Sequence, residues 1–290
     1  WSCLVSILPG MAQTEKLTDY VNPFVGTDGY GNVYPGAQIP FGGIQMSPDT
    51  DSRFYDAASG YKYNHLTLMG FSLTHLSGTG IPDLGDFLFI PGTGEMKLEP
   101  GTHEDPDKGY RSRYSHDKEW ASPNYYAVEL ADYGVKAEMT SGVRSGMFRF
   151  TYPESDSAFI MIDMNHTLWQ SCEWSNLRMI NDSTITGYKL VKGWGPERHV
   201  YLTATFSKKL TGLRFMQDKK PVIYNTSRFR SSYEAWGKNL MACLSFDTKA
   251  GEEVIVKTAV SAVSTDGARN NMKELDGLTF NELKAKGEAL

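Results

Sequence analysis

Cysteine is scarce in this chain of 290 residues, which holds only Cys3, Cys172 and Cys243. No CxxC or HxxxH pair occurs, so the usual zinc-binding patterns are excluded. Cys3 falls in a segment that resembles a targeting sequence. The other two cysteines could form one disulfide in an exported protein. The simpler prediction is two buried free thiols, because two cysteines alone say nothing about their distance.

Other features that the sequence lacks argue against several classes of function. The formal net charge is -5 and no cluster of Lys and Arg stands out, which argues against a nucleic-acid partner. No apolar stretch is long enough to span a membrane. A Gly-x-Ser-x-Gly motif is absent, and the glycines near the start lack the strand-to-helix context of a phosphate-binding loop. These absences argue against a serine hydrolase of that type and a nucleotide-binding enzyme.

Glycine and aromatic residues are abundant, with 28 Gly, 16 Tyr, 14 Phe and 6 Trp. The combination indicates short strands joined by tight turns, and it suits sugar binding because pyranose rings stack on aromatic rings. Period-two alternation and turn residues between segments predict an antiparallel all-β sandwich over residues 17–262. The predicted strands are 125–132, 134–141, 144–152, 158–164, 183–191, 199–206, 239–246 and 253–261.

The two ends of the chain have a different character. Residues 1–13 resemble the second half of a signal peptide, since an apolar run leads to small residues before a polar segment. Residues 263–290 are predicted to be helical, with Thr279 and Glu282 at the spacing of a capping box. Neither an initiator Met nor a helix stop signal is seen, so we expect the sequence to be truncated at both ends.

The first hundred residues are loop-rich and carry the polar groups that suit a site, because functional residues concentrate on loops held by a scaffold. Taken alone, each feature has a plainer interpretation. His75 could be a hydrogen-bonded structural residue, and Asp83 and Asp86 could cap turns or bind a metal. Trp169 and Trp194 are predicted to pack in the core or against a sheet rather than to bind sugar.

Several segments together resemble one family. They are VNPFVGTDGYGNVYPGAQIPFG, QMSPDT, SGYKY and GFSLTHLSGTGIPDLGDFLFIP, followed by weaker matches through ASPNYYAVELADYGVKAEMTSGVRSGMFRF, GWGPERHVYLTATFSK and VSTDGARNN. In this combination and order the chain is similar to glycoside hydrolase family 92, the exo-acting α-mannosidases. The resemblance covers nearly the whole chain.

The resemblance implies a bilobal, secreted or periplasmic enzyme, with tethering at the cell surface as a further option. Its large β-sandwich, of supersandwich type, would be followed by a helical linker and an (α/α)6 barrel beyond this sequence. It would hydrolyse α-mannosides of N-glycans or mannan with inversion, using two carboxyl groups set apart to admit water. Family members carry both groups and the ligands of a Ca²⁺ cofactor on the barrel, so no catalytic or metal-binding residue is assigned here, and we expect the fragment alone to be inactive.

The resemblance also places the sugar pocket between the two lobes, so the sandwich should form one of its walls. Short polar side chains among glycines leave room for a sugar and offer hydrogen bonds. The predicted substrate-binding residues are Thr27, Asp28, Gly29, Asp56, Ser59, Tyr61, His75, Ser77, Thr79, Ile81, Asp83 and Asp86. Residue 81 is expected to influence which glycosidic linkage is cleaved. Ile81 offers less stacking surface for a sugar ring than an aromatic residue would.

Two other functions fit the residues less fully. A stand-alone, lectin-like β-sandwich could hold mannose glycans without cleaving them, and an exported structural domain would bind no ligand. Helical sequence with acidic residues beyond Leu290 would favour the enzyme, whereas a stop codon there would favour a binding module.

Overall fold

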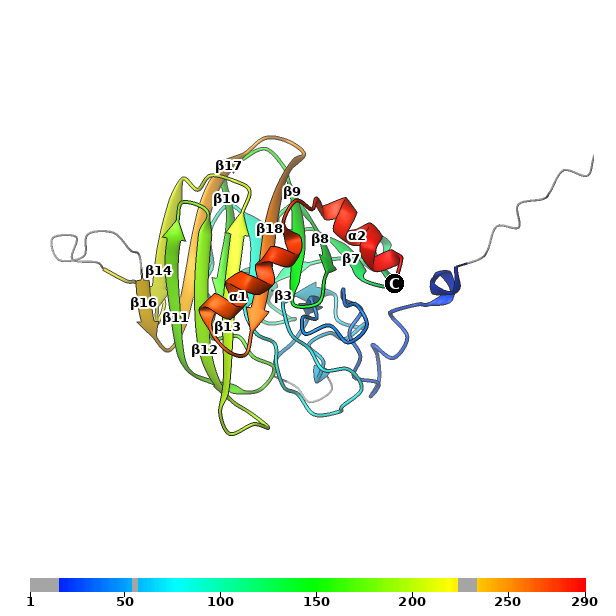
Figure 1. Ribbon diagram of the computed structural model, residues 1–290. Helices are drawn as coiled ribbons and strands as arrows, with labels where there is room; N and C mark the ends of the chain where they lie inside the picture. Colours follow the sequence, from blue (N-terminus) through cyan, green and yellow to red (C-terminus); the bar gives the residue numbers. More distant parts are fainter. Residues whose placement is uncertain (1–15, 54–56, 224–233) are drawn as a thin grey trace, which may run out of the picture.

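The computed structural model describes residues 16–53, 57–223 and 234–290, which fold around two large antiparallel sheets (Figure 1). The predicted signal-peptide segment 1–13 lies outside these residues. In the described part of the chain, one sheet has seven strands in the order β1-β3-β4-β10-β17-β14-β15. Their bounds, in that order, are Ser47–Asp49, Gly70–Ser72, Leu88–Thr93, Ser155–Asp163, Leu240–Thr248, Gly212–Gln217 and Lys220–Pro221.

The other large sheet has nine strands within the described residues, in the order β16-β11-β12-β13-β18-β9-β8-β7-β6. Their bounds are Glu234–Gly237, Ser171–Asn181, Thr184–Lys192, Arg198–Phe206, Glu252–Ser261, Ser145–Tyr152, Val135–Ser141, Tyr125–Leu130 and Glu119–Ser122. A small third sheet pairs β2 (Thr67–Leu68) with β5 (Ser112–Arg113). The prediction of an all-β antiparallel sandwich is confirmed.

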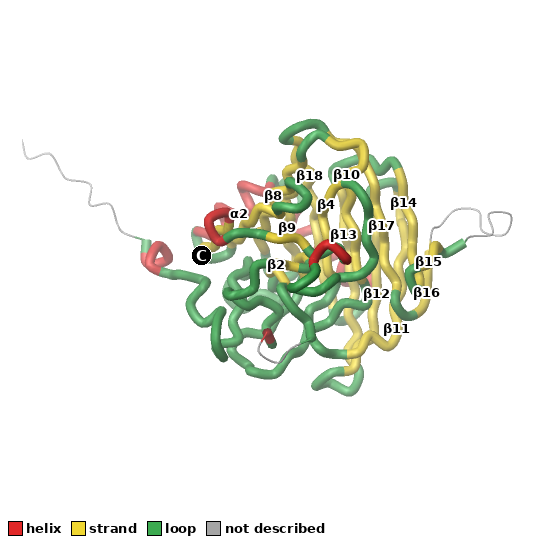
Figure 2. Tube along the Cα trace, turned by 180° about the vertical axis from the view of Figure 1, so that it is seen from behind, coloured by secondary structure: helices red, strands yellow, loops and turns green. Residues whose placement is uncertain are grey.

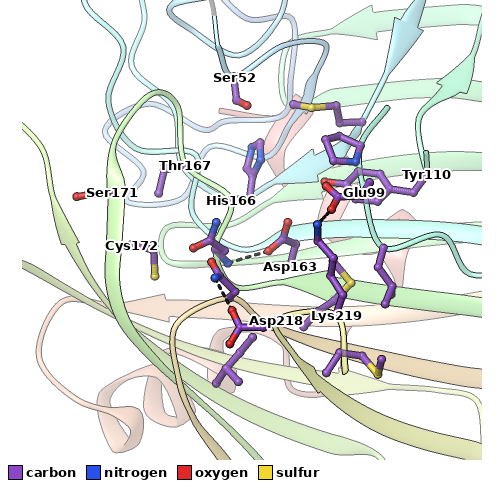
Figure 3. Close-up of a pocket in the computed structure, with 18 of the residues that line it drawn as sticks. Ser52, Glu99, Tyr110, Asp163, His166, Thr167, Ser171, Cys172, Asp218 and Lys219 are labelled. Atoms are coloured by element: carbon purple, nitrogen blue, oxygen red, sulfur yellow. Dashed lines mark hydrogen bonds and ion pairs between the residues drawn. The ribbon is translucent and has the colours of Figure 1, made fainter. Parts of the chain in front are cut away.

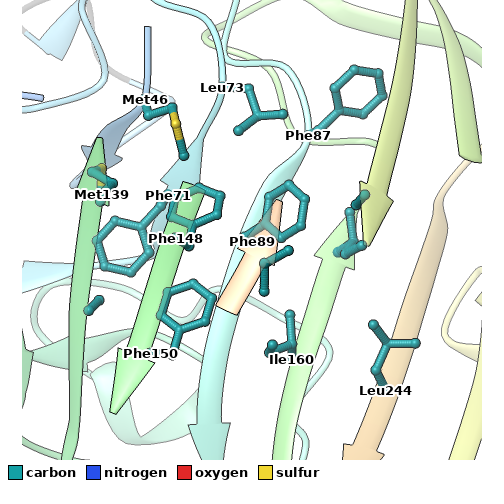
Figure 4. Packing of buried hydrophobic residues seen from close by; sticks show 14 of the residues in the cluster. Met46, Phe71, Leu73, Phe87, Phe89, Met139, Phe148, Phe150, Ile160 and Leu244 are labelled. Atoms are coloured by element: carbon teal, nitrogen blue, oxygen red, sulfur yellow. The ribbon is translucent and has the colours of Figure 1, made fainter. Parts of the chain in front are cut away.

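The main core lies between the two large sheets (Figure 4). Phe148 and Phe150 alternate inward along β9, and Phe71 and Phe89 face them from β3 and β4. The ring centroids of Phe89 and Phe148 are 5.1 Å apart, within the range of favourable aromatic pairs. Burying each of these side chains stabilises the fold by about 1.5–3 kcal/mol, so the period-two pattern of the strands directly produces the sandwich.

A second apolar cluster covers the outer face of the seven-stranded sheet. Leu88, Ile90 and Phe159 point outward from β4 and β10, and Tyr110 packs on them from the segment that precedes β5. This segment contains the 3₁₀ helix η3 (Pro106–Lys108) and wraps back over the sheet. The outer face is therefore partly covered by the chain itself, and its uncovered remainder borders a pocket described below.

Two helices cover the outer face of the nine-stranded sheet (Figure 1). Helix α1 (Thr265–Met272) packs on β18 and β13, and α2 (Phe280–Glu288) packs on β8 and β9. Phe280 and Leu283 form a small core with Met147 of β9. The predicted capping box is confirmed, because Thr279 and Glu282 exchange hydrogen bonds at the start of α2. None of the described helices has the length and apolar character needed to cross a membrane.

The loops gather at one end of the sandwich (Figure 2). Connections 73–87, 164–170 and 193–197 leave the two sheets at this end. Among the described residues, the remaining 3₁₀ helices are η1 (Leu17–Tyr20), η4 (His116–Lys118) and η5 (Lys273–Leu275). The sandwich thus brings loops that are more than a hundred residues apart in the sequence to a common position.

Candidate functional site

The predicted loops converge on one main-chain carbonyl, that of Asn32. Gly78 N donates to Asn32 O at 2.6 Å, and the Ser59 hydroxyl donates to the same oxygen. Tyr63 N, four residues after Ser59, donates to Thr27 O at 2.9 Å. The three segments selected from the sequence therefore form one continuous surface. Asp56, which belongs to the second segment, lies outside the described residues.

The first loop is a pair of tight turns around Thr27 and Asp28. Gly26 and Gly29 have φ angles of 84° and 58°, which glycine adopts without strain. Thr27 is buried and its hydroxyl donates to Phe24 O at 2.7 Å, so this side chain stabilises the turn. Asp28 is exposed, and one carboxylate oxygen accepts from Gly29 N at 2.7 Å. Its other oxygen can contact a ligand.

The second loop is held by buried groups. Ser59 and Tyr61 are almost fully enclosed. The Tyr61 hydroxyl donates to Glu119 Oε1 at 2.9 Å, and burial raises the pKa of Tyr61, so this hydroxyl stays neutral and donates inward. Both residues fix the shape of the loop from behind.

The third loop begins at His75, which is bonded on both sides of its ring. Nδ1 lies 2.8 Å from Gln45 O, and Nε2 lies 2.8 Å from Asp49 Oδ1. Because a carbonyl and an ionised carboxylate can only accept, each ring nitrogen faces an acceptor, which fixes the orientation of the ring. On its other oxygen Asp49 accepts from His166 Nε2 at 2.7 Å, and His166 lies on the connection between β10 and β11. The buried Asp49 carboxylate thus joins two loops.

The end of the third loop is anchored by Asp86, which is fully buried. Lys189 Nζ of β12 lies 3.3 Å from Asp86 Oδ1, and Arg198 Nη1 of β13 donates to Asp86 Oδ2 at 2.5 Å. Lys189 also donates to His166 O at 2.5 Å. Asp83 accepts from Leu84 N at 2.6 Å. We call the network of Asp49, His75, His166, Asp86, Lys189 and Arg198 the buried polar network.

Acid should weaken the buried polar network. Burial opposes ionisation of Asp49, but the charges and hydrogen bonds of His75 and His166 outweigh it and hold the pKa of Asp49 well below its usual range. Burial also opposes ionisation of Asp86, yet Lys189 and Arg198 hold its pKa below the usual value. Carboxylates with lowered pKa stabilise the fold above their unfolded pKa of about 4, and this contribution is lost as pH falls through that value toward the folded pKa.

We therefore expect the free energy of unfolding to decline steadily between about pH 5 and pH 3. Urea titrations at several pH values would measure it, with Asp86→Asn showing a shallower decline than the unmodified chain. Equal slopes for the two proteins would contradict the assignment of this acid sensitivity to Asp86.

The tip of the third loop is its exposed part. Ser77 and Thr79 are exposed and Ile81 is half-buried. Gly78 and Gly80 have φ angles of 72° and 64°, and an added Cβ at Gly78 would meet no neighbouring atom. The Thr79 hydroxyl donates to Ile81 O at 3.0 Å, which fixes the turn. The tip therefore presents hydroxyl groups and one aliphatic side chain outward without crowding.

A pocket of about 910 Å³ lies beside these loops, on the outer face of the seven-stranded sheet (Figure 3). Asp163 from the end of β10 and His166 line it, and Tyr110 forms part of its wall. Residues of the β14–β15 turn and the start of β17 complete it, among them Asp218 and Lys219. The sequence analysis selected none of these residues, because they come from segments that only the fold brings together.

The structure tests the predictions made for two cysteines and two tryptophans. Cys172 and Cys243 are buried free thiols, as the simpler prediction had it, and burial raises the pKa of Cys243 to about 12. Trp169 and Trp194 were predicted to pack in the core or against a sheet, and the core alternative is wrong, since the two residues are 61% and 65% exposed. Both residues lie on connections between strands.

Among the described residues, no group of three or more His, Cys, Asp or Glu side chains gathers to hold a metal ion. The carboxylates of the buried polar network are already paired with cations or imidazoles.

The antiparallel sandwich presents exposed hydroxyl and carboxylate groups and exposed Trp residues on its loops, a combination that suits carbohydrate binding. The sequence model of the Glycosyl hydrolase family 92 N-terminal domain matches residues 20–261, and this chain belongs to that family. The resemblance found in the loop motifs is confirmed, and it extends through the strands.

Solved structures agree with this assignment. A family GH92 α-mannosidase of Bacteroides thetaiotaomicron, in complex with mannoimidazole, is 97% identical with a TM-score of 0.92 over 95% of this chain. The chain covers 36% of that protein, so it spans about a third of its length. A GH92 inverting mannosidase of the same organism has the same fold, with 23% identity and a TM-score of 0.77 over 95% of this chain and 36% of its own.

A curated relative is more distant. An uncharacterized secreted glycosidase of Arthroderma benhamiae is 29% identical over 140 residues, which are 48% of this chain and 18% of that protein.

Proposed function

We propose that this chain is the N-terminal domain of a secreted, inverting exo-α-mannosidase that removes mannose from mannose-containing glycans. The observation that carries the proposal is the 97% identity to a GH92 α-mannosidase that was solved with a mannose-like inhibitor. The inverting relative supports the stereochemistry, and the secreted relative supports export or a periplasmic location. N-glycans and mannans are the substrate classes that this chemistry fits.

The role of this domain is to form one wall of the mannose pocket. The convergent loops support it, because Asp28, Ser77, Thr79 and Ile81 all face outward from the loop end. Their short side chains offer hydrogen bonds to sugar hydroxyls, while the buried polar network keeps the loops in place. The two carboxyl groups of the inverting reaction, about 6.5–9.5 Å apart, are supplied by the rest of the enzyme.

The first test is the division of roles between this chain and the rest of the enzyme. We expect the full-length protein to release mannose from α-linked mannobiose, and the 290-residue chain to release none, because the acid and the base lie outside it. Release is measured by chromatography of the products at matched protein concentrations. Hydrolysis by the 290-residue chain would overturn the division, and retained mannose binding by an inactive full-length protein would favour a lectin-like module.

The second test concerns the cofactor. We propose that Ca²⁺ is held by oxygen ligands outside this chain, since the described residues provide no such group. A chelator such as EGTA should lower mannose release by the full-length protein by at least tenfold, and added Ca²⁺ should restore it. Activity that is unchanged after dialysis against EGTA would remove Ca²⁺ from the proposal.

A further inference from the structure

Trp169 has a backbone conformation that is unfavourable for its residue type. Its φ angle is 66°, in the left-handed region, which costs an aromatic residue free energy that glycine would not lose. Its side chain is 61% exposed, so burial of the indole does not compensate for this cost. Strained residues of this kind cluster at ligand-binding and active sites, where the surrounding structure holds them.

The structure around Trp169 fixes this conformation firmly. Trp169 N donates to Thr167 O at 3.1 Å, and the Thr167 hydroxyl donates to Gln170 O at 2.8 Å, so the turn is closed on both sides of the indole. Leu168, only 1% exposed, anchors the turn in the interior, and its N–H donates to Leu84 O at 3.0 Å. The exposed ring therefore stands on a rigid base.

The indole lies at the pocket on the outer face of the seven-stranded sheet. This pocket combines a Trp ring with polar groups of the kind that bind sugar hydroxyls. Asp163, His166 and Asp218 line it (Figure 3), and Asn239, whose side-chain amide donates to Asp218 Oδ1 at 2.7 Å, lines it too. His166 is 7% exposed, and its Nε2 is occupied by Asp49, which fixes the orientation of the ring.

The same turn touches the third loop of the candidate site. Gln170 Nε2 donates to Pro82 O at 2.5 Å, and Pro82 directly follows Ile81. The turn that carries Trp169 is thus in direct contact with the third loop. A glycan chain with its terminal sugar at the loop tip could continue toward the pocket.

We propose that the pocket is a second pyranose-binding subsite, in which the Trp169 indole stacks on the apolar face of a sugar unit further along the glycan. The proposal rests on the function proposed above and deepens it, because it assigns this enzyme to oligosaccharides rather than single mannosides. Stacking uses the C–H face of the ring, while Asp163 and His166 accept or donate hydrogen bonds at its edge. Binding of this kind stabilises the bound substrate and the transition state equally.

The test uses Trp169→Gly in the full-length enzyme, with a linear α-mannotriose as the substrate. Glycine adopts a φ angle of 66° without strain, so this variant removes the ring without cost to the backbone, and circular dichroism should show an unchanged fold. We expect KM to rise about tenfold with kcat nearly unchanged, which is the signature of lost uniform binding. Trp169→Phe, which keeps an aromatic ring, should recover part of the loss.

The matched control is Trp120→Ala, which removes an exposed indole from the edge strand β6 and should leave KM unchanged. A KM for Trp169→Gly equal to that of the unmodified enzyme would overturn the subsite, as would an equal loss in Trp120→Ala. Failure of the unmodified enzyme to release mannose from the trisaccharide would instead overturn the proposed function. The two failures are therefore distinguishable.

Discussion

Asp49→Ala is expected to lower the free energy of unfolding of this chain by about 3–5 kcal/mol, because it removes a buried charge whose partners stay behind. Asp49 is fully buried and accepts from His75 Nε2 at 2.8 Å and from His166 Nε2 at 2.7 Å. Without the carboxylate, two buried imidazoles lose their shared acceptor. Urea denaturation at pH 7 measures the change.

A graded comparison separates charge from hydrogen bonding at this position. In Asp49→Asn the side-chain oxygen can still accept from a neighbouring ring N–H, but the amide carries no charge. We expect this variant to lose less stability than Asp49→Ala, about 1–3 kcal/mol. The control is Asp156→Asn on the exposed part of β10, with a change within about 0.5 kcal/mol. An Asp49→Ala protein as stable as this control would contradict the analysis.

Features set by neighbouring residues were predictable from the sequence. Strands β9 and β18 alternate clearly between apolar and polar residues, and their predicted bounds, 144–152 and 253–261, lie within one residue of the observed ones. The capping box at Thr279 was found because its whole pattern spans four residues. Local chemistry dominates the conformation at these positions.

Strand β11 (Ser171–Asn181) could not be predicted from the alternation of apolar and polar residues. It is the longest strand described, yet it was not predicted, because its inward positions are not uniformly apolar. Ser175 is fully buried and its hydroxyl donates to Gly237 O at 2.8 Å, while Leu177 packs in the core. A buried serine satisfied by another strand breaks the hydrophobic alternation, and only the partner strand explains it.

The candidate site was predictable in outline but not in its internal structure. The loops of Thr27, Ser59 and His75 were selected because the family resemblance implies a sugar pocket and their side chains are short and polar, and the fold brings them together at Asn32. The buried polar network could not be predicted, because Asp49 and His166 are 117 residues apart in the sequence. Composition identifies loops that can carry a site, whereas pairing of distant side chains depends on sheet topology.

The environments of Trp169 and Trp194 also could not be predicted from the sequence. The two residues were predicted to pack in the core or against a sheet, but both are exposed and lie on connections between strands. The left-handed φ angle of Trp169 is visible only in three dimensions. Exposed Phe41 has a similar φ angle of 57°, so the proposed subsite depends on the pocket beside Trp169 as well as on its backbone conformation.

Asp86→Ala is expected to lower the free energy of unfolding by about 3–5 kcal/mol, because it leaves Lys189 buried without a carboxylate. The Lys189 side chain is fully enclosed, and its Nζ lies 3.3 Å from Asp86 Oδ1. Arg198, the second cation on Asp86, is partly exposed and can be hydrated, so the larger penalty comes from the lysine. Urea denaturation at pH 7 again gives the free energy.

The double variant Asp86→Ala with Lys189→Met provides the decisive comparison, because it removes the charge and its stranded partner together. Since apolar side chains replace a buried ion pair at little or no net cost, the second substitution should recover much of the stability lost in the first. Glu129→Ala breaks the exposed Lys118–Glu129 pair, whose groups are 3.1 Å apart, and should cost less than about 1 kcal/mol. If the stability losses of the two single variants simply add in the double variant, Lys189 tolerates burial without Asp86. The third loop would then have to be held in place by a different contact.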